Sequence, residues 1–233
     1  MHLAWHADPL DYLLSGENVA SANYAIDVAT AAAKLGIPFL GAGTCAEYGS
    51  SNTDLLETDP TNPGSVYARE KLRALETTRE ICGESGSTWV WSRIFYPFGP
   101  AEHPARLVPQ VVRGLANNEG VSLGPCNQIR DQIDVRDVAE AFALLATRSI
   151  NDRSVEGIFN VSIGSAVPLR NWLTSLAGDQ RSLLHFADPL APPATNAGAE
   201  EAPARVVGNS KRLRSLGWIP KQPSPPHWSS LVS

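Results

Sequence analysis

Short apolar runs alternate with longer helical patterns in the first part of the chain, and this alternation constrains the fold more than any other feature. Residues 37–43 and 88–94 are apolar runs of strand length, while residues 15–35 and 65–82 carry apolar positions at helical spacing. Apolar strands that alternate with helices are typical of a parallel sheet covered on both faces. The sequence therefore predicts an α/β fold, with a further short strand at residues 2–5.

The chain changes in texture after residue 100, where the predicted elements become shorter. In chain order we expect a helix at 106–117, strands near 121 and 133, a helix at 137–147, a strand at 157–161 and a helix from 169. From residue 189 onward the chain is rich in proline and poorly periodic. There we expect one short basic helix at 209–216 and a loose tail after 220.

Composition argues against several classes of protein. Of the 233 residues, 43% are hydrophobic and 18% are charged, which is typical of a compact chain and not of a disordered one. The net charge of −5 gives no attraction for nucleic acid or for an anionic membrane, and no apolar run approaches the roughly 20 residues of a spanning helix. The first residues do not resemble a secretory signal, and Cys45, Cys82 and Cys126 are not spaced as a disulfide framework. We therefore expect a cytoplasmic protein with no nucleic-acid or membrane partner. We also expect no metal site, since no Cys or carboxylate cluster accompanies His2 and His6.

Tyr67 and Lys71 stand at positions i and i+4 of the predicted helix at 65–82, so they share one face of that helix. A phenol is a poor base at neutral pH because its reference pKa is about 10. An ammonium group one turn away favours the phenolate and lowers that pKa, so the pair could move a proton to or from a hydroxyl. On spacing alone, a solvated surface pair is the more frequent explanation.

Thr44 follows the apolar run at 37–43, and a hydroxyl at the carboxyl end of a parallel strand lies where such sheets bind ligands. Its hydroxyl could bind the substrate oxygen that Tyr67 protonates. The alternative is a turn residue whose hydroxyl bonds its own loop.

Several segments resemble, in the same order and at similar spacing, the motifs of one enzyme family. These segments are His2-Leu3-Ala4, Glu17-Asn18-Val19, Thr44 with Tyr48-Gly49, Tyr67 with Lys71, residues 93–100, and residues 128–131 with 134–138. Together they resemble the extended short-chain dehydrogenase/reductases, specifically the NAD-dependent epimerase/dehydratase group that acts on nucleotide sugars. The resemblance covers about residues 3–176 and Leu216-Gly217-Trp218 near the end. It implies a partial Rossmann-like parallel sheet with a smaller C-terminal α/β substrate lobe. It divides the chain into a residual cofactor domain at 1–100, a lobe mainly for the sugar nucleotide at 101–188 with some returning sheet elements, and a partly irregular segment at 189–233.

The resemblance also implies roles for individual residues. The catalytic group comprises Tyr67 as the acid/base, Lys71 as the residue that binds the nicotinamide ribose, and Thr44 as the residue that orients the sugar oxygen. The residues expected beside the cofactor, NAD or NADP, are Leu3, Ala4, Tyr67, Lys71, Phe95 and Pro97. The residues expected beside the substrate are Thr44, Tyr96 and Arg130, the last at the nucleotide phosphates. The alternative for Arg130 is an ion pair with a neighbouring carboxylate such as Asp131.

The largest departure from the family is that no strand, Gly-rich turn and helix for a dinucleotide precede His2. Residues 41–46 match G-x-G-x-x-A, but a loop follows them, so we interpret the match as coincidental. Without those first strands, the strand at 2–5 would be an exposed sheet edge. We therefore expect weak or no binding of NAD(H) and NADP(H) by this chain. We also expect either that the true gene product begins upstream or that this chain is a fragment or remnant.

The expected reaction type follows from a second departure. Family dehydratases carry Asp-Glu after the catalytic Thr, whereas this chain has Cys45 and Ala46, so C4 epimerisation or 4-keto reduction is the expected chemistry. Cys45 and His103 could act as second proton donors, although a structural role is the more frequent explanation for each. The family forms homodimers through a four-helix bundle, which here would use the helices at 15–35 and 65–82. The alternative to an enzyme is a truncated pseudoenzyme that keeps the substrate lobe and the dimer surface.

Overall fold

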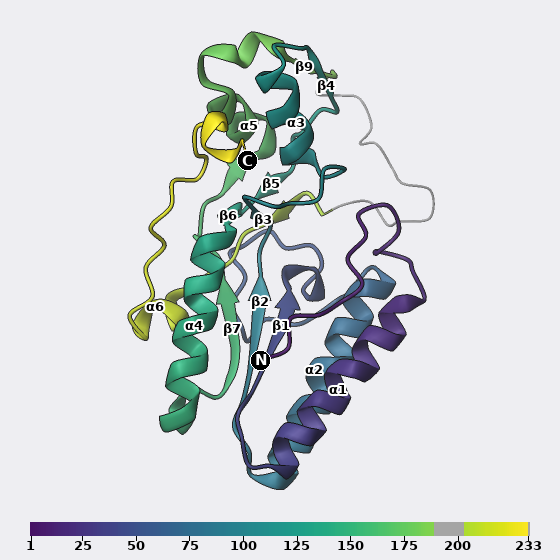
Figure 1. The fold of residues 1–233 in the computed structure, drawn as a ribbon, viewed down its shortest axis with the longest axis vertical. Helices are drawn as coiled ribbons and strands as arrows, with labels where there is room; N and C mark the ends of the chain where they lie inside the picture. Colours follow the sequence, from purple (N-terminus) through teal and green to yellow (C-terminus); the bar gives the residue numbers. More distant parts are fainter. Residues whose placement is uncertain (189–202, 233) are drawn as a thin grey trace.

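A three-stranded parallel sheet lies at the centre of the computed structural model, which describes residues 1–188 and 203–232 (Figure 1). The strands are β1 (Phe39–Thr44), β2 (Trp89–Ile94) and β7 (Gly157–Val161), in the order β1-β2-β7. The register aligns Gly41 with Trp91, and Trp91 with Ile158. Because all three strands run in the same direction, their carboxyl ends meet at one edge of the sheet. The prediction of an α/β fold with a parallel sheet is confirmed.

The two faces of the sheet are covered by different helices. Leu40 and Val90 pack in one cluster with residues of α4, whereas Phe39 and Trp91 pack in another with residues of α1 and α2. These helices are α1 (Glu17–Lys34), α2 (Val66–Ser85) and α4 (Val135–Asn151). Figure 1 shows α1 and α2 side by side along one side of the sheet and α4 on the other. Burial on both faces explains why the strands carry near-continuous apolar residues rather than an alternation, with polar residues toward their carboxyl ends.

Local sequence signals set the ends of these helices. The Ser65 hydroxyl accepts a hydrogen bond from the Ala68 N–H at 3.1 Å, and Gly86 ends α2 with a φ of 67°. The Asp134 carboxylate accepts a bond from the Arg136 N–H at 2.8 Å. This cap begins α4 at Val135, two residues before the start predicted from periodicity.

A second core lies at the end of the molecule that is uppermost in Figure 1. Its buried side chains come mainly from two helices and include Val111, Leu115, Trp172 and Leu173. The elements around this core are α3 (Leu107–Ala116), β4 (Val121–Leu123), α5 (Leu169–Ala177), β9 (Leu184–Phe186), which pairs in parallel with β4, and η4 (Trp228–Leu231). Two further small sheets consist of two-residue strands. One pairs β3 (Pro97–Phe98) with β6 (Ile133–Asp134), and the other places β5 (Ile129–Arg130) between β8 (Val167–Pro168) and β10 (Arg205–Val206). The remaining elements are η1 (Cys45–Glu47), η2 (Arg153–Val155), η3 (Gly178–Leu183) and α6 (Lys211–Ser215).

The predicted strand at residues 2–5 is wrong in its extent. His2 alone bridges to Gly41 in parallel, with its N–H donating to the Leu40 carbonyl at 2.8 Å. The chain then leaves the sheet, and the Trp5 indole N–H bonds the Asn18 side chain on α1 at 2.8 Å. A single bridge is enough to place the N-terminal segment beside β1 without extending the sheet.

The prediction of a loose tail after residue 220 is also wrong. The main-chain N–H groups of Lys221 and Gln222 donate to the Asp137 carboxylate at 2.8 and 3.1 Å. Trp228 packs against the second core, so hydrogen bonds and apolar burial both fasten the tail to the rest of the fold. Residues 189–202 of the predicted irregular segment lie outside the described residues.

Within the described parts of the chain, no helix is both long and apolar enough to cross a membrane. The same residues contain no group of three or more His, Cys, Asp or Glu side chains arranged to hold a metal ion.

Gly43 and Gly83 offer a matched test of sheet packing. A Cβ atom on Gly43 would lie 2.2 Å from Trp91 Nε1 and 2.8 Å from Glu47 Oε1, whereas one on the helical Gly83 would meet nothing within 4 Å. We expect Gly43→Ala to destabilise the fold by roughly 1–3 kcal/mol through overpacking. Gly83→Ala should instead stabilise it by roughly 0.5–1 kcal/mol through helix propensity. Urea denaturation measures both, and equal effects of the two substitutions would contradict this packing.

Candidate active site

Thr44 is positioned by the turn that follows β1. Its hydroxyl accepts a hydrogen bond from the Ala46 N–H at 3.2 Å, and its own N–H donates to Glu47 Oε1 at 2.9 Å. The Thr44 hydroxyl thus caps the start of η1 while the Glu47 side chain reaches back to the Thr44 N–H, as in a capping box. Thr44 therefore makes the local hydrogen bonds of a turn residue, as the alternative explanation predicts. This does not exclude a second role, because the hydroxyl also meets Tyr67.

The carboxylate of Glu47 is fully buried beneath this turn and has two further donors on β2. The Trp91 indole N–H lies 3.0 Å from Oε1, and Arg93 Nε lies 2.6 Å from Oε2. The Arg93 guanidinium also lies 4.2 Å from the centre of the Tyr48 ring. This buried ion pair links the carboxyl ends of β1 and β2 at the point where Thr44 stands.

Tyr67 lies half-buried in the first turn of α2, and its side chain is close enough to that of Thr44 for the two to interact. The ring centres of Tyr12 and Trp5 lie 5.1 and 6.3 Å from that of Tyr67, both edge-on. Burial raises the pKa of the Tyr67 phenol above its ordinary value, and the interaction with Thr44 opposes this only in part. The expected lowering of this pKa is therefore wrong for this conformation: burial is the largest influence and raises it, and Lys71 is not among the groups that shift it.

Lys71 is buried and directed toward β1. Its Nζ donates to the Ala42 carbonyl at 2.6 Å and lies 3.7 Å from the centre of a Trp5 ring. The distance from Nζ to the Tyr67 ring centre is longer, at 5.8 Å. Burial lowers the pKa of Lys71 to about 7, and the charge of Glu47 opposes this shift. The pair does share one helix face, as its spacing predicts, but the solvated-pair explanation fails.

Arg130 is the last residue of β5, in the small sheet that β5 forms with β8 and β10. Its guanidinium is 5.0 Å from the centre of the Tyr96 ring, and its Nη1 donates to its neighbour's carbonyl, that of Ile129, at 3.0 Å. Asp131, the alternative partner, points elsewhere and accepts main-chain N–H groups of Ile163, Gly164 and Gly208 at 3.2, 3.0 and 3.1 Å. The buried Arg130 is thus oriented toward an aromatic side chain.

The other residues expected beside the cofactor are dispersed. Leu3 is 58% exposed and Ala4 is exposed as well, so both are accessible. Pro97 is exposed on β3, whereas Phe95 is fully buried in a cluster with Tyr48. Phe95 therefore supports the strand ends from inside and offers no surface to a ligand in this conformation.

The two candidate second proton donors differ in their surroundings. Cys45 is buried among the site residues, and burial raises the pKa of its thiol to about 12, which makes it a weak acid. His103 is outside this cluster, where its Nδ1 accepts the Ala105 N–H at 3.1 Å. The structural explanation fits the bond that His103 makes.

Sequence reasoning missed four residues that shape this site. Trp5 covers Lys71, Tyr12 packs on Tyr67, and Arg106 lies 5.3 Å from the centre of the Tyr12 ring. Glu47 could have been found, because a Thr followed three residues later by Glu is the capping-box signature. The aromatic residues carry no such local signal.

The glycines of the G-x-G-x-x-A match serve sheet packing. A Cβ atom on Gly41 would lie 2.5 Å from the Trp91 ring, and one on Gly43 would strike the same indole. The three-residue 3-10 helix η1 follows in place of the long helix of a dinucleotide-binding turn. The interpretation of this motif as coincidental agrees with the structure, and these glycines do not fit the phosphates of a dinucleotide.

Comparison with known proteins identifies the family to which the chain belongs. The fold defines a Rossmann-like α/β protein, and the chain is matched over residues 1–162 by the model of the NAD dependent epimerase/dehydratase family. The chain belongs to that family.

Solved structures of similar fold include sugar-nucleotide enzymes. The UDP-N-acetylglucosamine 4-epimerase of Methanobrevibacter ruminantium M1, in complex with UDP-N-acetylmuramic acid, is 20% identical, with 94% of this chain and 70% of that one covered and a TM-score of 0.76. The UDP-glucose 4-epimerase of Thermus thermophilus, in complex with NAD, is 23% identical over 98% and 76%, with a TM-score of 0.76. RMD of Pseudomonas aeruginosa, complexed with NADPH, is 20% identical over 99% and 78%, with a TM-score of 0.81. At these identities the likeness confirms the fold.

The depressed pKa of Lys71 predicts a pH dependence of stability. Its folded-state pKa of about 7 lies below the ordinary value of 10.5, so between these values the unfolded chain binds more protons and stability rises with pH. Replacement by an uncharged side chain removes that dependence. We therefore expect the unfolding free energy of Lys71→Met, relative to wild type, to fall by about 1 kcal/mol or more from pH 6 to pH 10, the equivalent of about one pKa unit. Denaturant titrations at both pH values measure the difference. The exposed Lys34→Met is the control, and a parallel response of the two variants would contradict the buried ammonium.

Proposed function

We propose that this chain acts as a nucleotide-sugar C4 epimerase or 4-ketoreductase that depends on NAD or NADP. The observation that carries the proposal is the proximity of the Tyr67 and Thr44 side chains at the carboxyl end of β1, close enough for Thr44 to influence the pKa of the phenol. Two hydroxyls that meet at a strand end can both reach one substrate oxygen, which is what proton transfer to a sugar carbonyl requires. Membership of the epimerase/dehydratase family supports the same chemistry.

Each residue of the site has a defined part in this proposal. Tyr67, protonated because burial raises its pKa, donates its proton to the sugar carbonyl oxygen, and Thr44 orients that oxygen. In the reverse direction the sugar hydroxyl returns the proton to the Tyr67 oxygen. When bound, the nicotinamide supplies or accepts the hydride. Lys71 binds ribose hydroxyls through its ammonium, and Arg130 binds the phosphates of the sugar nucleotide.

The remaining assigned residues would complete the two binding surfaces. Leu3, Ala4 and Pro97 lie beside the nicotinamide in this proposal, and Tyr96 contacts the sugar. Cys45 replaces the acid of a dehydratase, and its raised thiol pKa makes it a poor substitute, which favours epimerisation or reduction over loss of water.

Two observations favour a second candidate function, a non-catalytic chain that binds a sugar nucleotide through its C-terminal lobe. Gly41 and Gly43 accommodate the Trp91 ring, so this motif does not provide a cradle for the phosphates of a dinucleotide. The Trp5 ring lies over Lys71, where ribose hydroxyls would have to bind. We therefore keep the expectation of weak or no binding of NAD(H) and NADP(H) by this chain.

Replacement of the phenol separates the two functions. In a panel of nucleotide sugars with NAD(H) or NADP(H), we expect Tyr67→Phe to lower kcat by about 10²–10⁴-fold, the usual contribution of a positioned acid or base. Tyr24→Phe is the matched control, because Tyr24 is 66% exposed on α1. Nicotinamide absorbance and product analysis at the sugar C4 provide the readout.

Other results of that panel have a clear meaning. A wild-type chain without turnover that binds a nucleotide sugar calorimetrically, and loses this binding in Arg130→Met, supports the non-catalytic function. Full activity of Tyr67→Phe would exclude the proposed proton relay.

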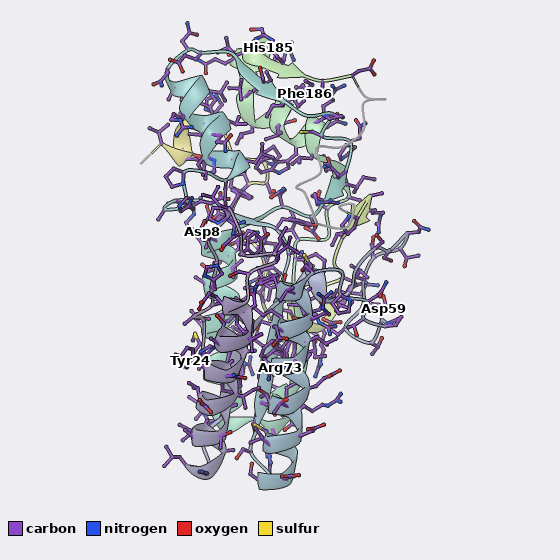
Figure 2. The ribbon with its side chains drawn as sticks, turned by 90° about the vertical axis from the view of Figure 1, so that its right-hand side faces the viewer. Asp8, Tyr24, Asp59, Arg73, His185 and Phe186 are labelled. Atoms are coloured by element: carbon purple, nitrogen blue, oxygen red, sulfur yellow. The ribbon has the colours of Figure 1, made fainter. Side chains whose placement is uncertain are left out.

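A homodimer through the α1 and α2 pair is part of the same proposal. Figure 2 shows Tyr24 of α1 and Arg73 of α2 on the outward side of these two helices, which lie next to each other. Apolar side chains are exposed on α1 at Val19, Tyr24 and Val28, by 45, 66 and 41%. Exposed apolar side chains on a long helix pair favour burial against a second copy in a four-helix bundle.

A charge placed on this surface should disrupt the dimer. We expect wild type to sediment as a dimer and Tyr24→Glu as a monomer, because a dimer would bury the new carboxylate without a partner. Leu10→Glu is the control, since Leu10 is 81% exposed and lies before α1. Analytical ultracentrifugation distinguishes the two states, and a wild-type monomer at every concentration would contradict the proposed interface.

A cytoplasmic location is also proposed. Cys45, Cys82 and Cys126 are free and buried, which is usual for proteins of reducing compartments.

A further inference from the structure

We propose that Trp5 is a gate that closes the amine of Lys71 to approaching molecules in the free protein. The inference goes beyond the proposed function because it concerns access to this amine, whatever reaction the site performs.

The first observation is the enclosure of the amine. Lys71 is 4% exposed, and its Nζ has the Ala42 carbonyl at 2.6 Å on one side and a Trp5 ring at 3.7 Å on another. An ammonium has three N–H donors, so further donors remain for a ligand oxygen. The Trp5 ring closes one of the directions from which a ligand could reach them.

The second observation is how Trp5 is fastened. Its indole N–H donates to Asn18 Oδ1 at 2.8 Å, and its ring lies edge-on to Tyr67. Asn18 is itself fully buried and fixed, because its Nδ2 donates to the carbonyls of Tyr12 and Ser15 at 2.6 and 2.8 Å. The closed position of the ring is therefore defined by a rigid acceptor and by the cation beneath it.

The third observation is that the Trp5 side chain can rotate while the main chain around it stays in place. Trp5 is only partly buried, and its neighbours Leu3 and Ala4 are exposed. His2 is bonded to β1, and the His6 N–H donates to the Ser21 hydroxyl at 3.0 Å, so the main chain is fastened on both sides of the ring. Rotation of one side chain, with loss of one hydrogen bond and one cation–π contact, opens the amine.

Acetylation by acetic anhydride, followed by site-resolved mass spectrometry of the full chain, measures this access. Acylation consumes the neutral amine. Burial holds the pKa of Lys71 at about 7, and an opened site would return it toward 10.5. The reaction is therefore run at about pH 11, above the ordinary lysine pKa, so that the amine is mostly neutral in every variant and steric cover limits the rate. The exposed Lys34 in the same sample is the internal reference.

We expect Trp5→Ala to raise the ratio of Lys71 to Lys34 acetylation by about tenfold or more, in keeping with loss of a ring that covers the amine. Trp228→Ala, at a partly buried indole of the second core, should leave the ratio unchanged. Trp5→Leu is a second variant for the case in which Trp5→Ala does not fold. Leucine keeps apolar volume in the cluster but is too short to cover Nζ, so this variant should also raise the ratio. An unchanged ratio in either folded Trp5 variant would overturn the gate. This readout is independent of turnover, so an inactive chain does not affect it.

Discussion

The buried carboxylate of Glu47 is the group on which the geometry of the candidate site depends. It accepts hydrogen bonds from the Thr44 N–H, the Trp91 indole and Arg93 Nε, which join the ends of β1 and β2. A buried ion pair adds little net stability, but removal of one partner leaves an uncompensated charge that costs about 3–5 kcal/mol. The turn after β1 is therefore held in one conformation, in which the Thr44 side chain meets that of Tyr67.

The sequence was informative wherever the signal was local. The strand at 157–161 has the predicted bounds, and α2 begins at Val66, one residue after the predicted start, because the Ser65 hydroxyl caps its first turn. The position of Trp5 over Lys71 could not be predicted, because it depends on a turn of the N-terminal segment and on an acceptor on α1. The tail after 220 is ordered for a similar reason, since its partner Asp137 lies far away in the sequence.

The Tyr67 and Lys71 pair illustrates the limit of spacing arguments. Positions four apart do share a helix face, as predicted, but spacing does not say where a long side chain points. Here the Lys71 amine turns to the Ala42 carbonyl, and burial raises the pKa of the phenol while it lowers that of the amine. Family membership identifies the pair as candidates, and the solvent access of each group decides its protonation.

The close approach of the Trp91 indole to Gly41 and Gly43 has a consequence for how homologous sequences can diverge. A side chain at either glycine requires a smaller ring on the neighbouring strand, and at Gly43 it also requires a shift of the Glu47 carboxylate. Replacements on β1 and β2 should therefore occur together in descendants of this chain, and the glycine pair would persist for as long as the indole does.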